Sequence, residues 1–367
     1  MTTSSPYRLV IPAVVEGSER PLWSVMIPTY NCAGFLRESL ASVLSQAPGP
    51  DLMQIEVVDD GSTQDDPEAI VQELGQGRVS FYRQPQNVGY IRNFETCLLR
   101  SRGHLVHILH GDDSVLPGFY QKLQTLFARH PDMGLVYCRH IFMDDRSQWQ
   151  RISVLEQNHS GLLNQALERI VTRHPIQTPA VVVRRAVYEQ LGGFDRRIQH
   201  SGEDWEMWCR IAAQYSVGYE IEPLALYRTH DKSLSGQSVR TGQDLENVRK
   251  AYQMVMTYLL PHQVATLGHR AAKFWALCGL NNALRFVENR DWRAVWAQVQ
   301  AALKFDHSLH MLATFSVYLG VAVLKQLLFR QEDRHILPDD DQSSSNLSAR
   351  PAATLSPVLQ SQGEEHQ

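Results

Sequence analysis

The chain has 367 residues, of which 43% are hydrophobic, so it can bury the core of one large domain and a smaller one. Its formal net charge is -4, and its Lys and Arg residues are scattered, which argues against nucleic acid as a partner. The five cysteines are widely spaced and form no C-x-x-C pair. They are expected to be reduced thiols, so a disulfide framework and a zinc site are both disfavoured.

The two ends of the chain bear on its location. Residues 1–15 lack a charged segment followed by an apolar run of signal length, so the catalytic part is expected to be cytoplasmic. Residues 311–329 are largely apolar but include Lys325 and Gln326. This pattern favours an amphipathic or buried helix over a membrane span. Peripheral contact with the inner face of a membrane stays open.

From Leu22 to about Val136, short apolar runs alternate with amphipathic helical stretches, which predicts an α/β sheet wound by crossover helices. Helical spacing of apolar residues predicts helices between the first two runs, between the third and fourth, and from Pro117 onward. The apolar runs span residues 23–27, 55–58, 79–82, 105–109 and 134–138.

Weaker signals follow in the next third. Residues 144–160 are polar and are expected to form a loop. A helix is expected near 162–172 and another from Glu203. Further strands are expected at 180–184, 217–221 and 226–227.

Four regions result from this organisation. They are a flexible N-terminus (1–20), an α/β domain (21–240), a helical C-terminal region (241–332) and a disordered tail (333–367). The tail is assigned from its Asp, Ser and Pro content and its few apolar residues.

Polar residues follow three of the predicted strands, where ligands bind in an open parallel sheet. The first strand runs into Pro28-Thr29-Tyr30-Asn31, and the second into Asp59-Asp60-Gly61-Ser62-Thr63. The second segment could simply be a turn and a helix cap. A carboxylate there could also accept the imide N–H of uracil or thymine.

The fourth strand is followed by His110-Gly111-Asp112-Asp113. Adjacent carboxylates after a buried strand repel each other unless a cation neutralises them. Mn²⁺ and Mg²⁺ prefer oxygen ligands and bind through one or two carboxylates plus phosphates. The alternative is a pair that caps the helix beginning at Pro117.

Two later segments carry further polar groups. Glu203-Asp204 opens a helix, where carboxylates can be mere caps, but either could also deprotonate an acceptor hydroxyl. Tyr227-Arg228-Thr229-His230 offers a guanidinium and an imidazole for phosphate oxygens, although a lone His230 is more often a surface residue.

Taken together, these segments resemble the family 2 glycosyltransferases, the large inverting group with the GT-A fold. The resemblance covers about residues 22–235 and runs in the family's order. The matching segments are Ser24-Val25-Met26-Ile27-Pro28-Thr29-Tyr30-Asn31, Val57-Val58-Asp59-Asp60-Gly61-Ser62-Thr63, Asn87-Val88-Gly89 with Arg92-Asn93, Gly111-Asp112-Asp113 with Pro117-Gly118, Arg184-Arg185, Gly192-Gly193-Phe194-Asp195, Glu203-Asp204-Trp205 with Arg210, and Tyr227-Arg228-Thr229-His230 with Ser233 and Ser235.

The resemblance implies a GT-A domain with a mixed, mostly parallel sheet, followed by the helical region. It implies that a nucleotide-sugar donor binds beside the metal, with Asp113 the direct ligand of Mn²⁺ or Mg²⁺ and Asp112 at the metal and the diphosphate. Asp204 matches the general base. The donor-binding residues that it implies are Pro28, Thr29, Tyr30, Asn31, Asp60, Arg92, Asp112, Arg228 and His230. Many family members have Asp where this chain has His110.

The function expected from this resemblance is metal-dependent, inverting transfer of a sugar from a UDP- or dTDP-type donor to a carbohydrate or lipid-linked acceptor, in polysaccharide or glycoconjugate synthesis. The G-x-G-x-x-G signature of dehydrogenases and the P-loop signature do not occur. A rival from a different class is a non-catalytic sugar-nucleotide-binding or scaffolding module. Hydrolysis of the donor separates the two.

Overall fold

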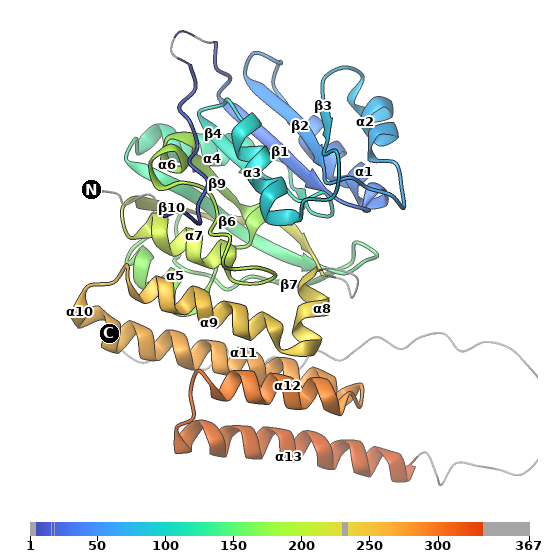
Figure 1. Ribbon diagram of the computed structural model, residues 1–367, viewed down its shortest axis with the longest axis vertical. Coiled ribbons are helices and arrows are strands. Elements are labelled where there is room, and N and C mark those ends of the chain that lie inside the picture. Colours follow the sequence, from blue (N-terminus) through green and yellow to red (C-terminus); the bar gives the residue numbers. More distant parts are fainter. Residues whose placement is uncertain (1–4, 16, 18, 230–233, 333–367) are drawn as a thin grey trace, which may run out of the picture. The chain divides into compact units, whose positions relative to one another are not determined.

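The computed structural model describes residues 5–15, 17, 19–229 and 234–332, and these residues contain a 10-stranded sheet (Figure 1). The sheet order is β3-β2-β1-β4-β9-β6-β10-β5, with β7 paired to β6 and β8 paired to β10. The strands are β1 (Trp23–Thr29), β2 (Met53–Asp59), β3 (Ser80–Arg83), β4 (Leu105–Ile108), β5 (Ser114–Val115), β6 (Met133–Met143), β7 (Trp149–Ile152), β8 (Gly161–Leu162), β9 (Val181–Arg184) and β10 (Ser216–Arg228).

Most of the long strands run in one direction. β1 is parallel to β2 and β4, β2 is parallel to β3, and β10 is parallel to β6. β9 lies antiparallel between β4 and β6, so it joins two parallel halves of the sheet. This is the mixed, mostly parallel sheet that the resemblance implies, and it turns the carboxyl ends of β1, β2 and β4 to one edge.

Helices cover both faces of the sheet. The core on one face includes apolar residues of α1, α2 and α4, and the core on the other includes residues of α3, α5, α6 and α7. The helices are α1 (Ala33–Leu44), α2 (Pro67–Gly75), α3 (Tyr90–Arg100), α4 (Phe119–Arg129), α5 (Ala166–Arg173), α6 (Arg185–Leu191), α7 (Glu203–Ala212), α8 (Leu234–Thr241), α9 (Gln243–Met256), α10 (Pro261–Gln263), α11 (His269–Glu288), α12 (Trp292–Leu303) and α13 (Leu309–Glu332).

The helices after α8 extend the second core. Val248 and Ala251 of α9 and Trp275 and Leu280 of α11 belong to the same buried cluster as Trp205 and Trp208 of α7. Residues 1–323 group into one compact unit. The domain boundary predicted at 240/241 lies at the end of α8 and stays a prediction.

The last helix differs from its neighbours because its apolar residues are largely exposed. Met311 and Phe315 are buried, whereas Leu309 is 86% and Val317 is 61% exposed. By length and composition, the window Leu309–Gln326 could cross a membrane, with a mean hydropathy of 1.2 and 11% of it buried. Of the two alternatives expected here, an amphipathic or a buried helix, the buried one is therefore wrong for most of the helix.

Two other predictions need correction. The N-terminal segment is packed where it is described, because Ile11 is buried and Arg8 pairs with Asp195 and Glu206. The expected loop 144–160 contains β7, which pairs with β6. The predicted disordered tail, 333–367, lies outside the described residues.

Candidate functional site

Three polar turns meet at one edge of the sheet because they follow neighbouring parallel strands. Thr29 at the end of β1 is opposite Asp59 at the end of β2, and Met26 of β1 is opposite Ile108 of β4. The turn after β4 is also tied to β1, since the amide of Gly111 donates to the carbonyl of Pro28 at 3.0 Å. The sequence prediction of a shared edge is confirmed.

Pro28 and Thr29 lie beneath this edge. The Thr29 side chain is 3% exposed, and its Oγ1 lies 2.8 Å from Sγ of Cys32. A Cβ atom at Gly111 would come within 2.8 Å of Thr29 Oγ1, so only glycine allows this approach. The structure thus gives Pro28 and Thr29 a supporting position rather than direct access to a ligand.

Tyr30 and Asn31 follow with different surroundings. Tyr30 is 46% exposed at the rim. Asn31 has a φ of 49°, and its Oδ1 accepts hydrogen bonds from the amides of Thr63 and Gln64 at 2.9 and 3.1 Å. Asn31 therefore holds the turn after β2, whereas Tyr30 is free to lie against a bound ring.

Asp60 organises the loop that leads into α3. Its buried carboxylate accepts hydrogen bonds from the amides of Val88 and Gly89 at 2.8 and 3.0 Å. Burial raises the pKa of Asp60, against the opposite effect of these two hydrogen bonds. Arg92, in the first turn of α3, lines an open cavity of about 350 Å³ together with Val88.

The turn after β4 brings His110, Asp112 and Asp113 together. One ligand atom from each lies within 4.8 Å of the other two. Asp113 is 1% exposed, its Oδ1 accepts the amide of Arg228 at 2.8 Å, and its Oδ2 has no hydrogen-bond partner. Burial and then the charge of Asp112 raise the pKa of Asp113, and the hydrogen bond and charge of Arg228 oppose this shift only in part.

These three side chains fit a divalent cation. An unpartnered buried carboxylate oxygen is a costly feature, and a cation would satisfy it. His110 supplies an imidazole where the resembled family often has Asp, and its Nε2 is likewise buried without a partner. The His110 ring is held in place by Phe94 of α3, with ring centroids 5.1 Å apart.

Arg228 is buried under the acidic turn, where its guanidinium is fully engaged by the protein. Its Nε donates to the carbonyl of Asp112 at 2.8 Å, and its Nη2 donates to Glu38 at 2.6 Å. Its Nη1 donates to the carbonyl of Asp144 and to Ser147. The prediction that Arg228 binds the donor directly is therefore corrected to a positioning role for the turn. His230 lies outside the described residues.

Asp204 lies at the start of α7, fixed through both carboxylate oxygens. Oδ1 accepts the amide of Trp205 at 2.7 Å, and Oδ2 lies 3.3 Å from Nε2 of His174. Burial tends to raise the pKa of Asp204, but the charge and hydrogen bond of His174 outweigh it, so this pKa is lowered. The carboxylate is therefore ionised at neutral pH.

The pKa of the adjacent carboxyl, Glu203, is shifted in the opposite direction. Burial and the charge of Asp204 raise the pKa of Glu203 to about 8. Its Oε2 is buried without a partner. Two neighbouring carboxyls whose pKa values are pushed apart are typical of acid–base sites. Asp204 is the one that can accept a proton at pH 7.

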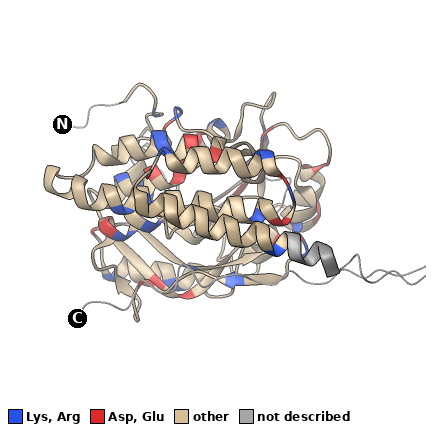
Figure 2. Cartoon of the chain, turned by 90° about the horizontal axis from the view of Figure 1, so that it is seen from below, with Lys and Arg blue, Asp and Glu red and all other residues tan. Residues whose placement is uncertain are grey.

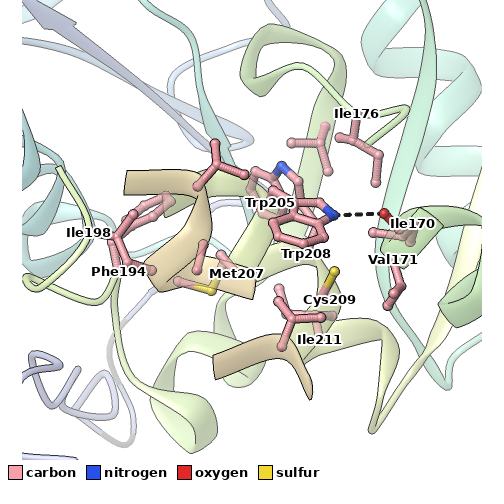
Figure 3. Close-up of a cluster of buried hydrophobic side chains, with 14 of the residues drawn as sticks. Ile170, Val171, Ile176, Phe194, Ile198, Trp205, Met207, Trp208, Cys209 and Ile211 are labelled. Atoms are coloured by element: carbon pink, nitrogen blue, oxygen red, sulfur yellow. Dashed lines mark hydrogen bonds between the residues drawn. The ribbon is translucent and has the colours of Figure 1, made fainter. Parts of the chain in front are cut away.

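The first turn of α7 is anchored by tryptophan packing. Trp205 is fully buried, and its Nε1 donates to the carbonyl of Ile170 at 2.8 Å (Figure 3). Trp275 of α11 packs on Trp205 and on His174, with ring centroids 5.2 and 5.7 Å apart. α11 thus supports both members of the Asp204–His174 pair.

The metal turn and the carboxyl pair belong to one site, because His110 lies close to both. Burial lowers the pKa of His110, and the charges of Asp112 and Asp204 act in the opposite direction. Sequence reasoning missed His174 and the contribution of His110, since a lone histidine has no readable pattern. The only available signal was that His110 stands beside two carboxylates.

The family model described as glycosyl transferase family 2 matches residues 24–192. An uncharacterized protein of Mycobacterium tuberculosis is 28% identical over 70% of this chain and 82% of its own length. An uncharacterized glycosyltransferase of Rickettsia typhi is 23% identical over 66% of this chain and 74% of its own length.

Solved structures share the fold. S. aureus TarS 1–349 in complex with UDP-GlcNAc has a TM-score of 0.55 at 15% identity, over 78% of this chain and 91% of that one. The mannosyltransferase PcManGT of Pyrobaculum calidifontis, in complex with GDP-Man and Mn²⁺, has a TM-score of 0.54 at 18% identity, over 87% of this chain and 84% of that one. With its mixed sheet and these structural likenesses, this chain has the GT-A fold, and its residues 24–192 match glycosyl transferase family 2.

Proposed function

We propose that the chain transfers a sugar from a UDP- or dTDP-type nucleotide sugar to an acceptor hydroxyl, with inversion at the anomeric carbon. The observation that carries this proposal is the buried Oδ2 of Asp113, which has no hydrogen-bond partner and lies 3.5 Å from Nδ1 of His110, in a site that also contains the ionised Asp204. One group can hold a metal, and the other can accept a proton. His110 lies near both.

Each part of the site has a task in this reaction. Asp112, Asp113 and His110 would hold Mn²⁺ or Mg²⁺, which when bound neutralises the charge of the departing diphosphate. Asp204 accepts the proton of the acceptor hydroxyl, and the oxygen attacks the anomeric carbon from the face opposite the leaving group. His174 and the amide of Trp205 keep the Asp204 carboxylate oriented.

The donor side is formed by the turns after β1 and β2 and by α3. The exposed ring of Tyr30 can lie against a base, and Arg92 opens onto the cavity at α3. The Asp60 carboxylate, which already accepts two amides, is the candidate acceptor for the imide N–H of uracil or thymine. This supports a pyrimidine donor.

We further propose that the chain is a cytoplasmic enzyme that contacts the inner face of a membrane and takes part in polysaccharide or glycoconjugate synthesis. The exposed apolar side of α13 supports membrane contact, because such a patch is costly in water. Lys and Arg residues are interspersed with acidic residues over the elements (Figure 2), which supports the expectation that nucleic acid is not a partner.

The metal gives the sharpest test of this function. Asp113→Asn keeps an acceptor for the amide of Arg228 but removes the charge, so we expect donor affinity with Mn²⁺ to fall at least about tenfold. The exposed Asp51→Asn is the matched control and should behave as wild type. Calorimetry with and without EDTA measures both effects. Equal affinity in excess EDTA would contradict the metal site.

A non-catalytic sugar-nucleotide-binding or scaffolding module is the second candidate, and slow release of nucleoside diphosphate from the donor separates it from an enzyme. The wild-type chain with Mn²⁺ is expected to release diphosphate without acceptor, and Asp113→Asn is not. Tight donor binding with no release above that of the variant would support the binding module.

A further inference from the structure

A second group of polar side chains lies on the face of the sheet opposite Arg228. Ile141, Met143 and Leu226 pack with Leu116 on one side of β6 and β10. Side chains alternate along a strand, so His140 and Phe142 of β6 and Tyr227 of β10 lie on the other side. Their rings confirm this, because Phe142 lies 4.8 Å from His140 and 5.7 Å from Tyr227, centroid to centroid.

Arg151 of β7 covers the Phe142 ring. Its Cζ is 3.3 Å from the ring centroid, and the residue remains exposed. Arg285 of α11 is also exposed. Neither arginine has a carboxylate partner within the part of the chain that the structure describes. We call His140, Phe142, Arg151, Tyr227 and Arg285 the cationic cluster.

The two arginines lie near each other. The pKa of Arg151 is lowered, first by its partial burial and then by the charge of Arg285. Cys278, which also acts on Arg151, is seven residues before Arg285 and so on the same face of α11. This face of α11 therefore turns toward β7. Two like charges near each other repel, and a bound anion would relieve this repulsion.

A second observation points to a ligand. His140 is 3% exposed, and its Nδ1 has no hydrogen-bond partner. Burial, followed by the charges of Arg151, His174 and Arg139, lowers the pKa of His140 to about 3, so the ring is neutral. A neutral imidazole can donate one N–H to an anion.

The cluster is linked to the proposed base through His174. The charge of His174 acts on His140, and its Nε2 lies 3.3 Å from Oδ2 of Asp204. The proposed donor residues, in contrast, come from β1, β2 and α3 at the other end of the sheet order. An anion bound at the cationic cluster would therefore belong to the acceptor, whose hydroxyl has to reach Asp204.

We propose that the acceptor is a phosphate-bearing molecule, bound through its phosphate by Arg151 and Arg285 of the cationic cluster; this inference rests on the proposed function of Asp204. Arginine suits this task because its planar guanidinium can make paired hydrogen bonds to phosphate oxygens. The phosphate can come from a lipid or from a water-soluble polymer, and the two sources need separate probes.

The test is a titration of the full-length chain with two phosphate probes and their uncharged counterparts. The lipid-like pair is dodecyl phosphate and dodecanol in neutral detergent micelles, and the soluble pair is an oligomer of glycerol phosphate and glycerol. Each titration is made with and without saturating UDP and Mn²⁺. One phosphate probe is expected to bind at least about tenfold more tightly than its counterpart.

Arg151→Gln and Arg285→Gln should each lower the affinity for that phosphate probe by about five- to tenfold. The control Arg129→Gln, at an exposed arginine on α4, should leave the affinity for the probe unchanged. UDP should not displace the probe. Three results would overturn the proposal: no preference for phosphate, equal behaviour of all three variants, or displacement of the probe by UDP.

A separate measurement shows whether the proposed transferase function itself fails. Donor affinity and metal-dependent release of diphosphate are recorded for the same preparations. If the phosphate probe binds as expected but the wild-type chain releases no diphosphate, the transferase assignment falls and the anion site stands. If release is normal and neither phosphate probe is preferred, only the acceptor inference falls.

Discussion

Asp204 is held by hydrogen bonds on both carboxylate oxygens, which fixes the orientation of the lone pairs that remain to accept a proton. Asp204→Asn keeps this shape and removes the basicity. Since a positioned carboxylate contributes about 10²- to 10⁴-fold to such a step, kcat should fall by at least about 10²-fold with donor affinity nearly unchanged. Glu203→Gln is the matched control and should be milder, because Glu203 is mostly protonated at pH 7. Near-normal turnover by Asp204→Asn, or a product of retained configuration, would contradict the assignment.

The pH dependence of the reaction should depend on His174. Its charge and hydrogen bond hold the pKa of Asp204 down against burial, so Asp204 stays ionised to low pH. In His174→Asn, which tolerates the left-handed backbone at this position, burial should prevail and that pKa should rise. The acidic limb of the kcat–pH profile is therefore expected to move to higher pH. The exposed His159→Asn provides the comparison, and identical profiles for both variants would refute a role for His174.

At this scale, the sequence predicts the local positions of residues in ordered motifs. Asp112 and Asp113 lie in the turn after β4, and Asp204 lies in the first turn of α7, whereas their roles stay predictions. Thr29 and Arg228 were given contacts with the donor, but tertiary packing buries them. His174 could not be predicted, because its contact with Asp204 joins residues 30 positions apart.

At the level of elements, α7 depends on α11 through Trp275. Trp275 is 8% exposed and lies against Trp205 and His174. Trp275→Ala removes a buried ring, so the free energy of unfolding should fall by about 3–5 kcal/mol. Trp296→Ala, at a position 62% exposed on α12, should change it by less than about 0.5 kcal/mol. Chemical denaturation measures both. Equal stability of the two variants would mean that α11 does not support α7.

The elements that the sequence predicts are those with strong periodicity. β1, β2, β4 and α4 are continuous apolar runs or clear amphipathic faces, and their positions are confirmed. β7 is exposed on all four residues, so no alternation marks it, and only its pairing with β6 makes it a strand. α2 was not predicted, although Asp66 caps it and Pro67 opens it.

For the whole molecule, the exposed side of α13 has the composition of a surface that meets lipid. Val317 is 61% and Val321 is 47% exposed, and a helix with apolar residues on its outer side is costly in water. We expect the full chain to float with neutral lipid vesicles in a density gradient. Val317→Lys with Val321→Lys should abolish flotation, whereas lysines at the exposed positions Gln121 and Gln124 of α4 should not. A chain that stays in the soluble fraction without any substitution would exclude this contact.

The sequence also predicts the order of the regions but not how closely they are joined. A helical region after the α/β domain follows from periodicity alone. Periodicity does not predict that α9 and α11 complete the core around α7. One such contact involves Gly202, whose φ of 88° and close approach to Val248 of α9 disfavour any side chain at this position. Such contacts depend on the three-dimensional arrangement and have no local signature.

Arg8 has a consequence for how this protein is made. Its guanidinium pairs with Asp195 and Glu206 and donates to the hydroxyl of Tyr258, residues that lie 187, 198 and 250 positions later in the chain. During synthesis, Arg8 must therefore wait until more than half of the 367 residues have been made before its first partner, Asp195, exists, and longer still for Tyr258. β1 to β4 can assemble while translation continues, but α7, which bears Asp204, gains its contact with Tyr258 only later, because Glu206 of α7 and Arg8 both bond to that hydroxyl. The helix that carries the proposed base is thus among the last parts of the molecule to be fixed.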